Sequence, residues 1–265
     1  MFIMMLLMKL IDTHCHLDFE VFNDDREQVL QEAGDVGLIG IVVPGTHQQG
    51  WKNLLSVCAA HDALYPAIGL HPMFLEQHQE SDIEKLEYAI NDSKPYAIGE
   101  IGLDYRDSVG DEGQQVFYFE QQVLLARKKE LPVILHILKA HDQALKILRN
   151  SPVCGGTVHA FNGSLQQAEQ YIELGFKLGF GGMLTYERSS KLRKLAADLP
   201  LESIVLETDA PDMTVFQHQY QRNSPVYLPY CLQALAGLRN ETPDVIAAQT
   251  TENAISVFKL DKDRQ

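Results

Sequence analysis

Residues 9–16 of the chain read KLIDTHCH, an apolar start that ends in two histidines. Asp12, His14 and His16 follow one another at a spacing of two. In an extended strand this spacing points all three side chains to one face. The stretch therefore predicts a short buried strand that delivers potential metal ligands at its C-terminal end. Taken alone, a His-x-His pair is compatible with several metals and many folds.

Seven further apolar runs alternate with longer stretches of helical pattern. Near-continuous apolar strands indicate a parallel sheet that crossover helices cover on both faces. Eight such units predict an α/β fold, a TIM-like (β/α)8 barrel. An open doubly wound sheet is the alternative, but no GxGxxG follows the first strand to support it. The further runs are GLIGIVVPG (37–45), LYPAIGLHP (64–72), YAIGEIGLD (96–104), LPVILHI (131–137), GTVHAF (156–161), FKLGFGG (176–182) and SIVLETDAP (203–211).

Length and composition favour one domain. The chain has 265 residues, of which 45% are hydrophobic and 22% charged, and no Pro/Gly/Ser-rich linker divides it. Barrels of this kind commonly occupy such a length as a single domain. We therefore expect one domain over residues 1–265, with an extra C-terminal helix at roughly residues 243–258. We interpret residues 1–7 as a product of start-codon choice, with Met8 as the initiator, a hypothesis that N-terminal sequencing tests.

The net charge of −14 argues against a broad basic face that binds phosphates nonspecifically. It does not exclude a nucleic-acid substrate, since bound metal ions can supply local positive charge. The four cysteines form no CxxC pair and indicate reduced thiols. The first ten residues lack a basic region and a cleavage site, and Asp12 interrupts the apolar run before it could span a membrane. We expect a cytoplasmic monomer with no membrane association and no obligate protein partner.

Six residues of metal-ligand type fall at the ends of five predicted strands. Barrel enzymes place their active sites on this face. One strand-end histidine is commonly a hydrogen-bonded core residue, but six ligand-type residues on one rim predict a metal centre. Their number exceeds what a single tetrahedral zinc needs and favours two divalent ions, although it does not distinguish zinc, manganese, magnesium, iron and nickel. The six are His14 and His16 (first strand), Glu100 (fourth), His136 (fifth), His159 (sixth) and Asp209 (eighth).

At these residues the sequence resembles the TatD-related metal-dependent hydrolases and deoxyribonucleases, within the amidohydrolase superfamily. The resemblance implies a TIM-like barrel, two divalent ions and DNA as the substrate, trimmed in the 3′-5′ direction. It also implies that His14, His16 and Asp209 hold one ion and that His136 and His159 hold the second, with Glu100 as the bridge. The matching stretches are IDTHCHLD (11–18), GLHP (69–72), IGEIGLDY (98–105), PVILH (132–136), HAFNGS (159–164) and LETDAP (206–211).

Two departures from the family pattern lie beside the predicted ligands. Ile137 and Leu138 stand where members often have Ser-Arg, and Asn162 stands where Ser is common. Neither replaces a ligand. The missing arginine puts the substrate and the rate in question, and Lys139 could take its place as a point charge without the bidentate fork.

Catalytic and substrate-contact roles follow from the resemblance together with the chemistry of the side chains. Asp209 is the expected general base, and Glu100 is the catalytic bridge. His71 is the expected donor to a substrate phosphate; its alternative is a rim histidine that stabilises the following turn. Asn223 is a further expected substrate contact, and Asp104, which lies near a ligand, is expected either to contact the substrate or to support that ligand.

Several neighbouring residues receive structural or mixed interpretations. Asp12 could fix the tautomer of a metal-bound histidine, or it could be a rim carboxylate with no metal role. Glu207 lies near the ligands and could support a ligand, contact the substrate or have a structural role. Arg222 is expected to serve helix capping and surface charge rather than phosphate binding. Solvated surface positions are expected for the remaining histidines, which are His47, His61, His78, His141 and His218.

Three functions compete. The first is a phosphodiesterase acting on DNA through activated water. The second is an amidohydrolase acting on a small amide, lactone or ester. Many binuclear members of that superfamily bridge their ions with a carbamylated lysine, whereas here Glu100 takes the bridge position and no strand-end lysine is available. The third, a non-catalytic metal-binding protein, is disfavoured by the complete set of six ligands.

Overall fold

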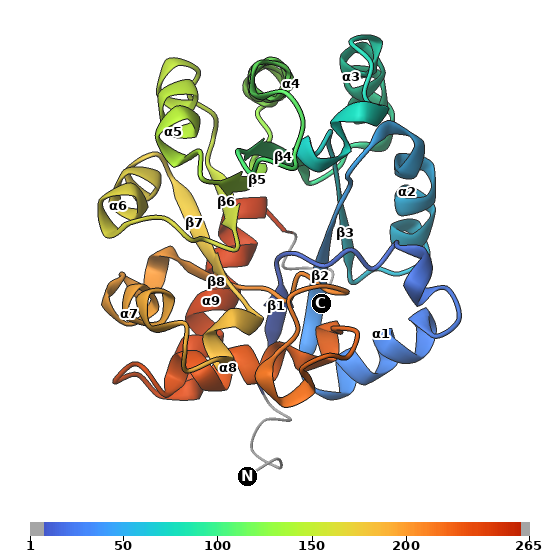
Figure 1. Ribbon diagram of the computed structural model, residues 1–265. Helices are drawn as coiled ribbons and strands as arrows, with labels where there is room; N and C mark the ends of the chain where they lie inside the picture. Colours follow the sequence, from blue (N-terminus) through green and yellow to red (C-terminus); the bar gives the residue numbers. More distant parts are fainter. Residues whose placement is uncertain (1–7, 261–265) are drawn as a thin grey trace.

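A computed structural model describes residues 8–260 of the chain. The hypothesis that residues 1–7 arise from start-codon choice lies outside the described residues. The fold is an eight-stranded parallel barrel surrounded by helices (Figure 1). The prediction of a TIM-like (β/α)8 architecture is therefore confirmed, and the open doubly wound alternative is not what the chain adopts.

The strands pair with one another in chain order, each parallel to the next. Nearly every strand residue is buried, because the strands face the barrel interior on one side and the helices on the other. The strands are β1 (Leu10–Asp12), β2 (Leu38–Pro44), β3 (Leu64–Ile68), β4 (Ala97–Asp104), β5 (Val133–Leu138), β6 (Gly156–His159), β7 (Phe176–Phe180) and β8 (Ile204–Leu206).

One helix follows each strand and packs on the outside of the barrel (Figure 1). Apolar residues at helical spacing make the inner side of each helix; in α3, for example, Leu86 and Ile90 are buried while Tyr88 is exposed. The eight helices are α1 (Arg26–Asp35), α2 (Trp51–Ala59), α3 (Ser81–Ser93), α4 (Glu112–Lys129), α5 (His141–Asn150), α6 (Leu165–Glu173), α7 (Ser190–Asp198) and α8 (Leu228–Ala236).

A ninth helix, α9 (Pro243–Phe258), closes one end of the barrel. Its residues Ala254 and Phe258 belong to the same buried cluster as Ile11 of β1, Val42 of β2 and Val205 of β8. The extra C-terminal helix predicted from the sequence is therefore present, and it fills the N-terminal end of the barrel with apolar side chains. The opposite end, where the strands terminate, stays open to the loops.

The seam between β8 and β1 is closed by hydrogen bonds of the residues that follow these two strands. Thr13 donates its backbone N–H to the carbonyl of Leu206, and Asp209 donates in turn to the carbonyl of His14, at 3.0 and 2.8 Å. His16 adds a third bond to the carbonyl of Ala210 at 2.8 Å. The seam thus consists of the two segments that carry three of the predicted metal ligands.

Among residues 8–260, no helix combines the length and the apolar character needed to cross a bilayer.

Candidate metal centre

All six predicted ligands converge at the open end of the barrel. Glu100 and His136 lie within β4 and β5, and His159 is the last residue of β6. His14 and His16 lie beyond the end of β1, and Asp209 lies beyond the end of β8, on the seam described above. The strand ends therefore position three ligands directly, and the hydrogen-bonded seam positions the other three.

Glu100 lies at the centre of this group, and its two carboxylate oxygens face different histidines. Oε2 lies 3.2 Å from Nε2 of His14 and 3.5 Å from Nε2 of His16. Oε1 lies 3.2 Å from Nδ1 of His136 and 3.4 Å from Nε2 of His71. The side chain is only 2% exposed. One carboxylate oxygen is thus available on each side, which is the arrangement that a bridging ligand requires.

The first group of ligand atoms comprises His14, His16 and Asp209. The Nε2 atoms of the two histidines lie 3.3 Å apart, and Oδ1 of Asp209 lies 3.6 and 3.7 Å from them. Nδ1 of His16 donates to the carbonyl of Pro44 at 3.1 Å, which leaves Nε2 as the ring nitrogen that can ligate a cation at the centre. Such a backbone contact is the usual way to orient a metal-bound imidazole.

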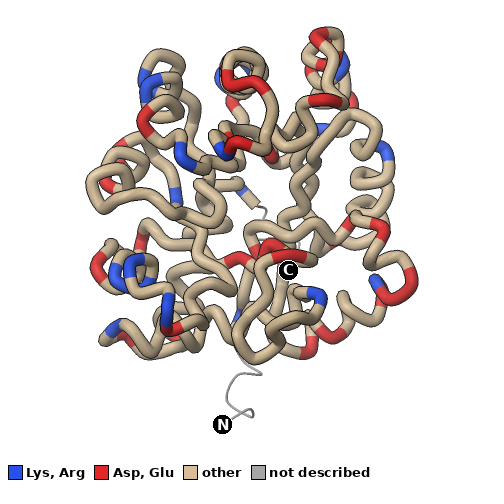
Figure 2. The backbone as a smooth tube through the Cα atoms, viewed as in Figure 1, with Lys and Arg blue, Asp and Glu red and all other residues tan. Residues whose placement is uncertain are grey.

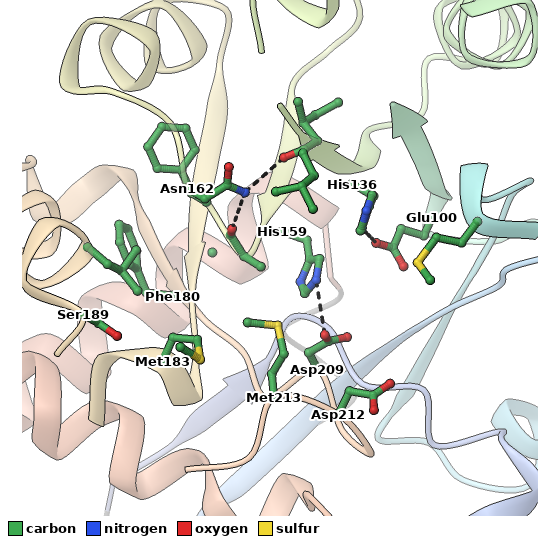
Figure 3. A pocket seen from close by; sticks show the side chains of 18 of the residues that line it. Glu100, His136, His159, Asn162, Phe180, Met183, Ser189, Asp209, Asp212 and Met213 are labelled. Carbon is green, nitrogen blue, oxygen red and sulfur yellow. Dashed lines mark hydrogen bonds and ion pairs between the residues drawn. The ribbon is translucent and has the colours of Figure 1, made fainter. Parts of the chain in front are cut away.

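His159 is oriented by a buried carboxylate. Its Nδ1 lies 3.0 Å from Oε1 of Glu207, while its Nε2 lies 3.5 Å from Oδ2 of Asp209 (Figure 3). Oε1 of Glu207 also accepts from the backbone N–H of Ala160 at 2.6 Å. Gly179 leaves the room for this carboxylate, because a Cβ there would lie 2.1 Å from Oε2 of Glu207. Glu207 thus holds His159 with Nε2 directed at the centre.

His136 lies between two carboxylates. Its Nδ1 faces Glu100, and its Nε2 lies 3.1 Å from Oδ2 of Asp104. Asp104 is fully buried, and the guanidinium of Arg106 donates to both of its oxygens. Asp104, predicted as a substrate contact, is therefore placed where it holds His136 and pairs with Arg106.

His71 joins the centre as a hydrogen-bond donor. Its Nδ1 accepts from the backbone N–H of Met73 at 3.0 Å, so the proton of the neutral ring resides on Nε2, the atom near Glu100. Burial lowers the pKa of His71 to about 4, which keeps the ring neutral. A nitrogen that carries a proton cannot ligate a cation, so this tautomer suits a substrate contact.

The surroundings keep both central carboxylates ionised. Burial alone would raise the pKa of Glu100, but His71 and His14, together with a hydrogen bond from His136, lower it well below its ordinary value. Burial likewise opposes the ionisation of Asp209, yet His159 and the other histidines lower its pKa to about 2. Anionic carboxylates are the form that ligates divalent cations.

The donor set fits divalent metal ions. Nε2 of His16 lies 3.5 and 3.7 Å from the carboxylates of Glu100 and Asp209. Burial lowers the pKa of His16, but the two carboxylates raise it to about 9, and a divalent cation between these groups would take the place of the ring proton. Within residues 8–260, ligand atoms gather in three overlapping groups, and Glu100 or His14 belongs to each. The ligand atom of His136 lies close to those of Glu100 and His71 but not to that of His159. The expected pair of His136 and His159 therefore does not form one group of ligand atoms in this structure. The three groups are His14, Glu100 and His159; His14, His16 and Asp209; and His71, Glu100 and His136.

The centre lies at the base of a cavity of about 750 Å³ (Figure 3). Its walls are largely apolar, and Phe19 and Phe74 present half-buried rings to it. Ile137 and Leu138 line it where the family pattern has Ser-Arg. The two phenylalanines were not predicted from the sequence, although each follows a histidine-bearing motif by one or two residues. That adjacency is the signal by which they could have been found.

The remaining predicted residues are placed away from the centre. Asn223 is fully buried, and its amide donates to the carbonyls of Thr208 and Asp212 at 2.8 and 2.7 Å. It does not line the cavity and instead holds the loop that carries Asp209. Arg222 pairs with Asp25 through both terminal guanidinium nitrogens, Nη1 and Nη2, at 3.0 and 2.5 Å. This pairing agrees with its expected structural role.

Comparison with known proteins agrees with the family resemblance of the sequence. The family described as TatD related DNase matches residues 11–259. The uncharacterized metal-dependent hydrolase YjjV of Escherichia coli K12 is 41% identical over 261 residues, covering 96% of this chain and 100% of the relative. The crystal structure of YjjV, described as a TatD homolog, superposes with a TM-score of 0.90 over 95% of this chain and 98% of that one, at 40% identity. The 3'-5' ssDNA/RNA exonuclease TatD of Erwinia billingiae is 31% identical over 260 residues, covering 95% of this chain and 99% of the relative.

The barrel and its histidine–carboxylate centre thus define a metal-dependent hydrolase. The chain belongs to the TatD-related family.

Proposed function

We propose that the protein hydrolyses phosphodiester bonds of single-stranded nucleic acid, with DNA as the substrate and 3′-5′ trimming as the mode. The observation that carries the proposal is the position of Glu100, whose two oxygens face opposite sides of one buried histidine cluster. Two divalent ions a few ångströms apart, bridged by a carboxylate, are the arrangement that serves in-line displacement at phosphorus. A relative of this chain carries the name of a 3'-5' ssDNA/RNA exonuclease.

In this proposal the ligands divide between the two sides of Glu100. His14, His16 and Asp209 would hold one ion. On the other side, His136 and His159 would hold the second, which requires their ring nitrogens to approach each other because they share no group of ligand atoms here. When bound, divalent ions polarise a phosphoryl oxygen and favour the ionisation of water near neutral pH.

The protein's own side chains then orient the reactants and move the proton. Asp209 is 16% exposed and lines the cavity, so its carboxylate can accept a proton from the attacking water. His71 can donate from Nε2 to a phosphoryl oxygen as negative charge accumulates there. Attack by the water oxygen forms one P–O bond and breaks the P–O bond to the adjoining nucleotide, whose oxygen takes up the proton that Asp209 accepted. Phe19 and Phe74, at the wall of the cavity, offer faces on which a nucleobase can stack.

The test compares substrates on one preparation. Protein reconstituted in turn with zinc, manganese, magnesium, iron and nickel is assayed on 3′-labelled single-stranded DNA, on RNA, and on a panel of amides, lactones and esters. We expect hydrolysis of the nucleic acids, with products shortened from the labelled end. Activity confined to the carbonyl panel would overturn the proposal in favour of an amidohydrolase.

A matched variant separates chemistry from folding. Asp209→Asn keeps the size of the side chain but removes its basicity, and we expect it to abolish turnover while most of the metal stays bound. Near-native activity of this variant would contradict the role assigned to Asp209.

A further inference from the structure

Positive charge is concentrated in one sector of the barrel. Residues 139–194 contain eight Lys and Arg but four Asp and Glu, a net charge of +4, whereas the rest of the chain carries −18. This segment includes α5, α6 and the first half of α7, which are neighbours around the barrel (Figure 1). Basic residues gather on this side in Figure 2, and acidic residues predominate around α1 and α3. A polyanion approaching the open end is therefore attracted to the α5–α7 side.

A second cavity of about 600 Å³ opens within this sector, beside the one that holds the metal centre. It lies at the N-terminal turns of α5 and α6. Asn162 and Lys191 line both cavities, so the two are adjacent. A substrate that extends from the metal centre past Asn162 enters the second cavity.

The second cavity has two unpaired cations. Lys139 and Lys191 both line it, both are exposed, and neither has an ion-pair partner among residues 8–260. The lining contains one carboxylate, Asp142, which already accepts from Nε2 of Gln167 at 2.8 Å. The charged side chains of the lining thus leave a net positive charge, which a single anionic group would neutralise.

Asn162 fixes the wall between the cavities. Its Nδ2 donates to the carbonyls of Ile137 and Ala160, both at 3.1 Å (Figure 3). Its Oδ1 accepts from Nε2 of His141 at 3.2 Å, and Nδ1 of that ring contacts the hydroxyl of Tyr171 at 3.3 Å. Because these contacts tie the ends of β5 and β6 to α5 and α6, the distance between the two cavities is set by the barrel itself.

We propose that the second cavity binds the phosphate next to the scissile one in a nucleic acid strand, with Lys139 and Lys191 as its cations. This inference rests on the proposed function and adds to it the path that the strand takes, from the metal centre across Asn162 to α5 and α7. Ile137 and Leu138 leave the wall of the metal cavity apolar at the end of β5, and the next residue, Lys139, places its charge in the second cavity instead. In this proposal the scissile phosphate lies at the metal centre, and the neighbouring phosphate, which anchors the strand, lies in the second cavity.

Two substrates distinguish a specific phosphate site in the second cavity from a nonspecific attraction of the substrate by positive charge. A dinucleoside monophosphate has one phosphodiester and cannot occupy both cavities, whereas a trinucleoside diphosphate has two. For K139A/K191A we expect KM to rise about tenfold on the trinucleoside diphosphate, because charge-assisted contacts to one phosphate are lost. KM on the dinucleoside monophosphate and kcat on both substrates should stay within a factor of about two.

Lys52→Ala is the matched control. Lys52 is an exposed lysine in the first turn of α2, in the more acidic part of the barrel, and it does not line either cavity. Lys52→Ala removes one positive charge, half of what K139A/K191A removes, and should leave KM unchanged on both substrates. Equal effects of K139A/K191A on the two substrates, or no effect on either, would overturn the proposal. If the wild-type protein hydrolyses neither, the proposed function itself fails.

Binding gives a readout that does not depend on turnover. A fluorescent single-stranded oligonucleotide is titrated against chelator-treated protein, and its anisotropy is followed over a range of salt concentrations. Losing one phosphate contact should reduce the slope of log K against log salt by about 0.7 in K139A/K191A. An unchanged slope would contradict the phosphate site in the second cavity. This outcome can be read whether or not the protein hydrolyses the oligonucleotide.

Discussion

Asp12 and Thr208 are joined by a buried hydrogen bond of 2.6 Å, from the Thr208 hydroxyl to Oδ2 of Asp12, across the seam between β1 and β8. Oδ1 of the same carboxylate accepts from the backbone N–H groups of Thr208 and His14, at 3.0 and 3.2 Å. The sequence left open whether Asp12 fixes the tautomer of a metal-bound histidine or has no metal role. Its carboxylate ties together the two segments that carry His14, His16 and Asp209.

Breaking this bond should destabilise the fold. Thr208→Val keeps the shape of the side chain but leaves a carboxylate oxygen of Asp12 buried without its donor. We expect the free energy of unfolding to fall by about 1–3 kcal/mol, measured by chemical denaturation. Thr208→Ser keeps the hydroxyl and should cost less than half as much. A loss in Thr208→Ser as large as that in Thr208→Val would contradict the prediction, because serine keeps the hydroxyl and lacks only the methyl group.

Gly179 should be required for metal affinity although it cannot ligate. A methyl group there would lie 2.1 Å from Oε2 of Glu207 and displace the carboxylate from His159 and from the N–H of Ala160. For Gly179→Ala we expect affinity for divalent metal to fall about 10–100-fold, measured by equilibrium binding with a competing chelator.

Gly34→Ala is the control for Gly179→Ala. Gly34 lies in α1, and a Cβ there meets no atom within 4 Å. Since alanine is the better helix former, this variant should keep native metal affinity and gain up to about 1 kcal/mol of stability. Native affinity in Gly179→Ala would mean that Glu207 does not orient His159.

The sequence predicted the barrel and the convergence of the ligands because both depend on local patterns. Apolar runs mark the strands, and parallel strands bring residues such as Glu100, His136 and His159 to one end whatever the loops do. The contact between Asp12 and Thr208 joins residues 196 positions apart, and no local pattern encodes it.

Side chains outside the strands were harder to place. His141 was expected on the surface, and that expectation was wrong: it is 6% exposed, because the hydrogen bonds to Asn162 and Tyr171 satisfy its ring nitrogens. The burial of Asn223 likewise depends on a loop conformation that composition does not specify. The second cavity could not be foreseen, because it forms between helices whose N-terminal turns meet only in the closed barrel.

His71 should contribute to turnover without holding metal. Because its Nδ1 accepts from Met73, its Nε2 carries the proton and can only donate. For His71→Ala we expect kcat to fall by about 10²–10³, as for the loss of one donor to a developing oxyanion, with unchanged metal content by atomic absorption. His136→Ala is the comparison, since it should lose bound metal together with activity. Loss of one metal equivalent in His71→Ala would make His71 a ligand.

Thiol reactivity reports on the packing around the seam. Cys15, Cys58 and Cys231 are buried, and burial raises the pKa of each thiol, whereas Cys154 is exposed. The thiolate is the reactive form, so Ellman's reagent should label one thiol per folded chain at pH 8 and four after denaturation. Because their pKa values are raised, the buried thiols should stay protonated and unreactive at pH 9 as long as the protein is folded. Cys154→Ser should abolish labelling of the folded protein, and residual labelling would reveal opening of the fold around Cys15, Cys58 or Cys231.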